Sequence, residues 1–162
     1  MADQTPENFG SAITVALTTT LVGQLTSGGT VGRFLASALL KLKPESLTIP
    51  VSDEATPLST GVAKVTFRMP YAFTLTGVRG SVTTAPTGGT LLTVDINEGG
   101  VSILSTKLTF NASSKTTVGA STPAVISDTS LADDAEITID IDAIGSTIAG
   151  AGLKITLLGR QT

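Results

Sequence analysis

The stretch "AEITIDIDAI" (residues 135–144) alternates apolar and polar side chains with a period of two residues. Neighbouring side chains of a β-strand point to opposite faces of a sheet, so this segment has one apolar and one polar face. The apolar face carries Ile137, Ile139, Ile141 and Ala143. The opposite face carries Thr138, Asp140 and Asp142. The pattern predicts a half-buried antiparallel strand whose polar face meets solvent or a neighbouring chain.

Comparable segments, separated by turns rich in Pro and Gly, extend over residues 46–162. We expect strands at 46–51, 62–69, 71–82, 135–144 and 153–159, a hairpin over 91–110 that turns at "NEGG" (97–100), and one short strand within 111–128. About eight strands at regular spacing are typical of all-β domains. The sequence therefore predicts a mainly β fold, an antiparallel β-sandwich or jelly roll, for residues 46–162.

Residues 1–45 are expected to form an N-terminal arm used for anchoring or oligomerisation. Within it, "GRFLASALLKLKP" (32–44) has apolar side chains at helical spacing and stops at Pro44, which predicts one short helix at 33–43. A core helix of the β domain is the other interpretation. We prefer the arm because residues 46–162 already resemble a complete domain. The apolar residues expected at its interface are Phe34, Leu35, Leu39 and Leu42.

The composition limits the chemistry that this chain can perform. It contains no histidine and no cysteine, which excludes Ser–His and Cys–His catalysis, disulfides and zinc–thiolate sites. The net charge is −3 and no basic run is present, so we expect no nucleic-acid partner. Charged residues make up only 14% of the chain, which suits a protein whose surface is largely covered by partners. We expect no cofactor.

The apolar segment "SAITVALTTTLVGQL" (11–25) is interrupted by threonines and is too short to span a bilayer. It also lacks the basic start of a signal peptide. We therefore expect no membrane partner and no export signal.

The acids around the opening stretch admit three interpretations. The favoured one is a solvated strand face preceded by loop acids. The second is a calcium site at Asp133 and Asp134, although the D-x-[DN]-x-[DN]-G loop pattern is absent. The third, a carboxylate pair for glycoside hydrolysis, is disfavoured because the chain has one Tyr and no Trp to line a sugar-binding groove. The basic residues Lys64, Arg68 and Arg79 are expected to pair with acids across strands.

Two long stretches resemble a β domain found in tailed bacteriophages and prophages. They are "IPVSDEATPLSTGVAKVTFRMPYAFTLTGVRGSVTTAPTGGTLLTVDINEGGVSILSTKLTF" (49–110) and "PAVISDTSLADDAEITIDIDAIGSTIAGAGLKITLLG" (123–159). In that family the domain is a virion structural module of small surface proteins and of the tips of fibre-like proteins. The resemblance implies a virion protein made in the bacterial cytoplasm, and it brings no catalytic residues.

Together these observations predict a non-enzymatic virion structural protein. The first hypothesis is a capsid decoration or cement protein, a homotrimer whose residues 1–45 bind the major capsid protein or another virion protein. The alternative is a tail or head fibre protein that binds host surface glycans through loops 83–90 and 111–123. A small enzyme such as a capsule depolymerase is disfavoured by the absence of His, Cys and Trp.

Overall fold

The computed structural model describes residues 43–162. The residues expected at the arm interface (Phe34, Leu35, Leu39 and Leu42) lie outside the described residues, as does the helix expected at 33–43 except for its last position. The chain divides into two units, residues 1–43 and residues 44–162. The second unit is the β domain.

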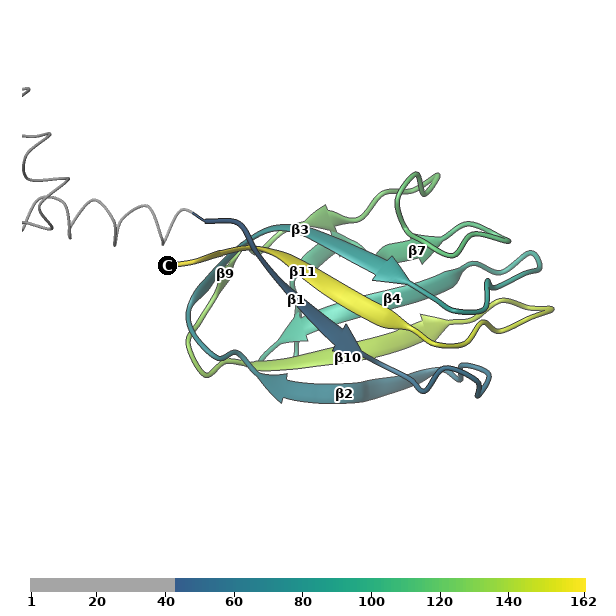
Figure 1. Ribbon diagram of the computed structural model, residues 1–162, viewed down its shortest axis with the longest axis horizontal. Helices are drawn as coiled ribbons and strands as arrows, with labels where there is room; N and C mark the ends of the chain where they lie inside the picture. Colours follow the sequence, from purple (N-terminus) through teal and green to yellow (C-terminus); the bar gives the residue numbers. More distant parts are fainter. Residues whose placement is uncertain (1–42) are drawn as a thin grey trace, which may run out of the picture. The chain divides into compact units, whose positions relative to one another are not determined.

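The β domain is mainly β and antiparallel, as the alternation predicted, and residues 43–162 contain no helix. The strands are β1 (Glu45–Pro50), β2 (Gly61–Arg68), β3 (Phe73–Ser81), β4 (Leu92–Glu98), β5 (Val101–Ser102), β6 (Leu104–Thr106), β7 (Leu108–Phe110), β8 (Val125–Ile126), β9 (Ser130–Leu131), β10 (Glu136–Ala143) and β11 (Lys154–Gln161). The first sheet has the order β1-β11-β3-β9 (Figure 1). The second has the order β2-β10-β4-β5, with β7 also pairing with β4, and β6 pairs with β8 separately.

One buried apolar cluster receives side chains from both sheets. The opening stretch forms β10, between β2 and β4, and its isoleucines at 137, 139 and 141 are at most 1% exposed. The prediction for these three residues is confirmed. From the first sheet, Phe73, Leu75, Ile155 and Leu157 enter the same cluster. Burial of this apolar surface is the main stabilising contribution to the domain.

Strand β3 departs from the regular alternation expected over 71–82. Leu158 of β11 lies opposite Gly77, but the next residue, Gly159, lies opposite Leu75. Thr76 is therefore an extra residue, a β-bulge that reverses which side chains face inward. Before the bulge Leu75 is buried, and after it Val78 packs against the core, although strict alternation would place it on the opposite face.

The second half of the expected hairpin 91–110 is broken into β5, β6 and β7. Its turn is as predicted, with Gly99 and Gly100 at positive φ between β4 and β5. Ile103 and Leu104 follow one another and are both buried, Ile103 between β5 and β6 and Leu104 at the start of β6. At this point the chain leaves β4, pairs with β8 through β6, and returns to β4 as β7.

The two ends of the β domain carry different features (Figure 1). Glu45 at the start of β1 pairs with Gly159 near the end of β11, so the domain's chain ends lie together. The opposite end is formed by four loops, 51–60, 82–91, 111–124 and 144–153 (Figure 1). We call this end the loop pole. Backbone hydrogen bonds join its loops: Leu58 N to Gly150 O at 2.8 Å, Thr87 N to Ile148 O at 2.9 Å and Ser113 N to Pro86 O at 2.8 Å.

Candidate functional site

The acids of β10 lie on the outer face of the second sheet, where each has a defined partner. Asp140 accepts hydrogen bonds from the backbone N–H of Ala63 at 2.7 Å and from Asn97 Nδ2 at 3.1 Å. Ala63 has a φ of 48°, an unusual value for a residue with a side chain, and lies where the register of β2 against β10 shifts. The Asp140 carboxylate thus satisfies a backbone donor that the irregular ladder leaves free.

A second group on this face contains a buried carboxylate. Asp95 of β4 is only 5% exposed and accepts hydrogen bonds from Ser102 Oγ at 2.6 Å and from the backbone N–H of Ile96 at 2.8 Å. Lys107 Nζ lies 3.0 Å from Asp95 Oδ2 and 2.6 Å from Asp142 Oδ2. Asp142 and then Asp95 raise the pKa of Lys107 above its ordinary value of 10.5. The Lys107 ammonium stays ionised at neutral pH, and its two contacts join β4, β10 and the segment before β7.

The stability contributed by Lys107 is expected to disappear only at strongly alkaline pH. Because folding raises the pKa of this group, its contribution is complete below 10.5, the unfolded value, and is lost as pH rises through the folded pKa. Lys107→Met should therefore lower the free energy of unfolding by a constant amount from neutral pH to about pH 10. The difference from the wild type should shrink at higher pH.

Urea denaturation of both chains across this range measures the difference. We expect about 1–3 kcal/mol at neutral pH, because Lys107→Met leaves the Asp95 carboxylate, whose side chain is only 6% exposed, without its cation. The pair with Asp142 adds little, because Lys107 and Asp142 are 43% and 36% exposed and solvent screens them. If the difference in unfolding free energy between the wild type and Lys107→Met falls as the pH is lowered from 9 to 7, Lys107 does not stabilise the domain as a cation.

The remaining charged groups of the outer face have local partners among the described residues. Glu136 pairs with Arg68 at 3.4 Å, as expected for acids and bases across strands. Lys64 instead donates to Ser59 Oγ at 2.9 Å, and Arg79 forms no salt bridge within residues 43–162. No buried side-chain N or O atom of the described residues lacks a hydrogen-bond partner. These contacts favour the interpretation as a strand face. Asp95 and Asn97 of the neighbouring strand β4, for which the sequence makes no prediction, are buried.

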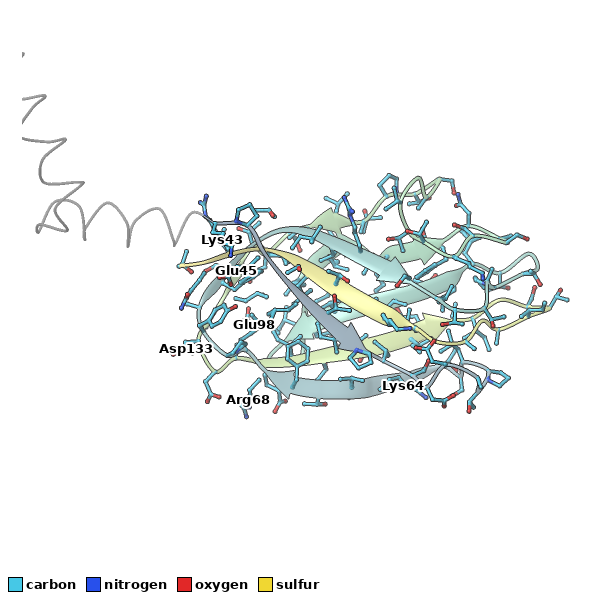
Figure 2. All side chains as sticks on the ribbon, viewed as in Figure 1. Lys43, Glu45, Lys64, Arg68, Glu98 and Asp133 are labelled. Atoms are coloured by element: carbon cyan, nitrogen blue, oxygen red, sulfur yellow. The ribbon has the colours of Figure 1, made fainter. Side chains whose placement is uncertain are left out.

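The calcium candidates Asp133 and Asp134 lie in the turn between β9 and β10, and both are exposed. Asp134 has a φ of 57°, and Ala135 N donates to Ala132 O at 3.2 Å across the turn. The carboxylate of Glu98 accepts from the backbone N–H of Ala132 at 2.9 Å. Residues 43–162 contain no group of three or more acids placed to hold a metal ion. Figure 2 shows Asp133 at the end of the domain that also carries Glu45.

The loop pole brings together the two loops singled out for ligand binding, 83–90 and 111–123, and adds two others. A cavity of about 370 Å³ opens between loops 51–60, 82–91 and 144–153, and its lining residues include Pro57, Thr84 and Ile148. Ile148 is 47% exposed. From the sequence, loops 51–60 and 144–153 could be recognised only as turns, by their Pro, Gly and Thr content. A turn pattern does not show which loops lie together in the folded domain. Small polar and aliphatic groups line the cavity.

A larger groove lies along β3, on the side away from β11. Its volume is about 500 Å³, and it is lined by Thr76–Arg79 together with Leu108, Thr117, Val118 and residues 123–126. Two apolar side chains of this groove are well exposed, Val118 at 59% and Val125 at 50%. No pattern in the sequence predicted this groove, because it depends on where the chain between β7 and β9 leaves the edge of β3.

Within residues 43–162 there is no helix with the length and hydropathy needed to cross a membrane. Comparison with known proteins gave no match to a family model, a curated protein or a solved structure.

Proposed function

We propose that this chain is a non-enzymatic structural protein of a bacteriophage virion, most simply a capsid decoration or cement protein. In this proposal residues 1–45 bind the major capsid protein or another virion protein, and the β domain projects from the shell as a homotrimer. Binding across neighbouring capsid subunits adds buried area at their seams, so it stabilises the assembled shell by mass action. The protein is made in the bacterial cytoplasm and functions in the virion.

The strand order supports a jelly roll as the finer description of the fold. When the short segments β5 to β7 are counted as one strand and β8 is left aside, the β domain has eight strands in chain order. The two sheets then read 1-8-3-6 and 2-7-4-5. This order, in which consecutive strands pass between two facing sheets, is that of the jelly roll used by many viral capsid domains.

The observation that carries the proposal is the separation of the domain's chain ends from its loop pole. Glu45 and Gly159 are paired at one end, and the four long loops are joined at the other (Figure 1). A domain attached through its first residues would therefore present the loop pole away from the attachment point. This polarity suits a module that projects from a particle.

The outer face of the first sheet supports the trimer. Where β1 and β11 meet, this face is neutral and rich in threonine: the hydroxyls of Thr48 and Thr156 lie 3.1 Å apart, and Leu158 lies beside them on β11. Arg79 of β3 lies opposite Thr156 on the same face. The second sheet instead carries the ion pairs of Arg68 and Lys107 on its outer face. The neutral part formed by β1 and β11 loses little hydration when copies of the chain associate, whereas a charged surface is costly to bury.

Thr156→Arg is expected to weaken self-association of the full chain at least tenfold, because it places a charge in the neutral part of this face and a second guanidinium opposite Arg79. Sedimentation equilibrium over a range of concentrations measures the trimer–monomer distribution. The matched control is Thr66→Arg, the same change on the exposed face of β2 in the other sheet, and it should leave association unchanged. A monomeric wild-type chain, or equal effects of the two substitutions, would contradict the trimer face.

The experiment that tests the virion assignment is the copy number in purified particles, measured by mass spectrometry against the major capsid protein. Tens to hundreds of copies per particle would support the decoration role. Roughly three to eighteen copies would match one or a few symmetric tail oligomers and support the alternative. Absence of the chain from particles produced by cells that express it would overturn the virion proposal.

The alternative is a tail or head fibre protein that binds host surface glycans at the loop pole. The cavity of about 370 Å³ between the loops is the observation that favours it. Calorimetry with purified host polysaccharide fragments should then detect binding, and Ile148→Trp, which fills the mouth of the cavity, should remove it. Intact particles with unchanged host adsorption after this substitution would argue against the fibre role.

A further inference from the structure

The edge of β3 that faces away from β11 is paired only at its two ends. At the first end Phe73 and Thr74 pair with β9, and Leu75 N donates to Thr129 O at 2.8 Å. At the other end Gly80 N donates to Thr117 Oγ1 at 2.9 Å, and Thr117 N donates to Gly80 O at 3.0 Å. Between these points, at Thr76–Arg79, no described strand lies beside β3 on this edge.

Val78 presents both of its backbone hydrogen-bonding groups to this gap. In an antiparallel ladder the N–H and C=O groups of one residue point to the same side, and alternate residues point to the same side. The N–H and C=O of Gly80 point toward Thr117. Val78 lies two residues before Gly80, and the bulge at Thr76 does not separate them, so the N–H and C=O of Val78 point to the same side. No hydrogen bond of these two groups to another described residue is found outside the strand ladders.

The groove of about 500 Å³ along β3 opens directly on this gap. Its floor includes the buried Leu108, and its walls include Ala124 and Ile126, so its interior is largely apolar. Val118 and Val125 stand exposed at the rim. Arg79 is also at the rim, and its charge has no acidic partner within residues 43–162.

We propose that this groove binds an extended peptide segment of a partner protein as an added strand beside Val78. The peptide backbone pairs with the N–H and C=O of Val78, an aliphatic side chain enters the groove, and a neighbouring carboxylate of the peptide meets Arg79. The N–H donor and C=O acceptor of Val78 can pair with the C=O and N–H of one residue of an extended peptide. A side-chain pocket next to a free strand edge is the arrangement by which proteins bind a peptide as an added strand. The proposal does not depend on the virion assignment.

The size of the gap limits the bound segment. The four residues from Thr76 to Arg79 span about 13 Å at roughly 3.3 Å per residue, so about four peptide residues fit between the flanking contacts. Two further features identify the chemistry of the peptide. The apolar interior selects a branched aliphatic side chain, and the unpaired Arg79 selects an acidic neighbour by charge complementarity.

The test is a titration of the full ¹⁵N-labelled chain with two capped pentapeptides, SVDVS and SVKVS, followed by amide shifts and hydrogen exchange. We expect the SVDVS peptide to shift the amides of residues 76–79 and 124–126, and to bind at least fivefold more tightly than SVKVS. The Val78 amide should exchange rapidly in the free protein and at least tenfold more slowly at saturation. N-methylation of both valine amides of SVDVS should remove this protection, because the valine that enters the groove is the residue whose backbone pairs with Val78.

Arg79→Glu is expected to reverse the preference, so that SVKVS binds more tightly than SVDVS. The matched control is Lys64→Glu, which makes the same change of charge on β2 of the other sheet (Figure 2) and should leave the preference unaltered. Arg79 is exposed, so the fold should be retained, which an unchanged spectrum away from the groove verifies.

Four results would each overturn the proposal. One is the absence of any shift with either peptide at 1 mM. Another is a set of shifts that maps away from the groove, or a preference that Arg79→Glu does not alter. The last is a concentration-dependent shift of the same amides without peptide, which would assign the groove to a second copy of this chain.

Discussion

Phe110→Ala is expected to lower the free energy of unfolding by about 3–5 kcal/mol, the range for removing a large aromatic side chain from a core. Phe110 ends β7 in the second sheet and is fully buried. Its ring reaches the first sheet, because a Cβ added to Gly80 of β3 would lie 2.6 Å from Phe110 Cζ. The residue therefore fills space between the two sheets that no neighbouring side chain can take over without moving a strand.

Equilibrium denaturation in guanidinium chloride measures this loss. Val118→Ala is the matched control: Val118 is 59% exposed, so its truncation should change stability by less than about 0.5 kcal/mol. A loss below about 1 kcal/mol for Phe110→Ala, with an unchanged denaturant slope, would mean that the space between the sheets collapses around the smaller side chain.

Gly159→Ala should also destabilise the domain strongly, by about 2–3 kcal/mol, through overpacking. Gly159 lies in β11 next to the Thr76 bulge, opposite Leu75. A Cβ at this position would overlap the backbone carbonyl oxygen of Thr74 and the ring of Phe73, which is buried in the core. The clash with backbone cannot be relieved by a change of rotamer, so β3 and β11 would have to separate.

The chain provides a control for this prediction in Gly89. A Cβ at Gly89 has no neighbouring atom within 4 Å, and this glycine is not among those at positive φ. Gly89→Ala should therefore be neutral or stabilise the protein by up to about 1 kcal/mol, because it restricts the unfolded chain. Thermal unfolding of the two variants compares them directly. Equal stabilities would contradict the close approach of β3 and β11 at Gly159.

Local sequence patterns predicted the long strands because each signal is contained within the strand itself. The alternation of "EITIDIDA" is produced by the pleat, and the "NEGG" turn by the need for positive φ. The exclusion of histidine and thiol chemistry follows from composition alone. The same local reasoning failed at the Thr76 bulge and at Ile103 and Leu104, where the direction of a side chain depends on the partner strand.

The candidate sites were less predictable than the strands. Of the three basic residues expected to pair with acids across strands, Arg68 does so, with Glu136. The burial of Asp95 beside Lys107 and the groove along β3 were not expected. Both features bring together residues that are distant in the sequence. Their proximity depends on the course of the chain after β4.

Residue types and their local spacing were enough to establish a mainly β antiparallel domain, the inward face of β10, and a chain without His or Cys chemistry. The strand order of the two sheets, the joining of four loops at one pole, and the free edge at Val78 became visible only in the folded domain. These features arise from contacts between residues far apart in the chain. Such contacts depend on how both sheets pack around one core, and no local pattern encodes them.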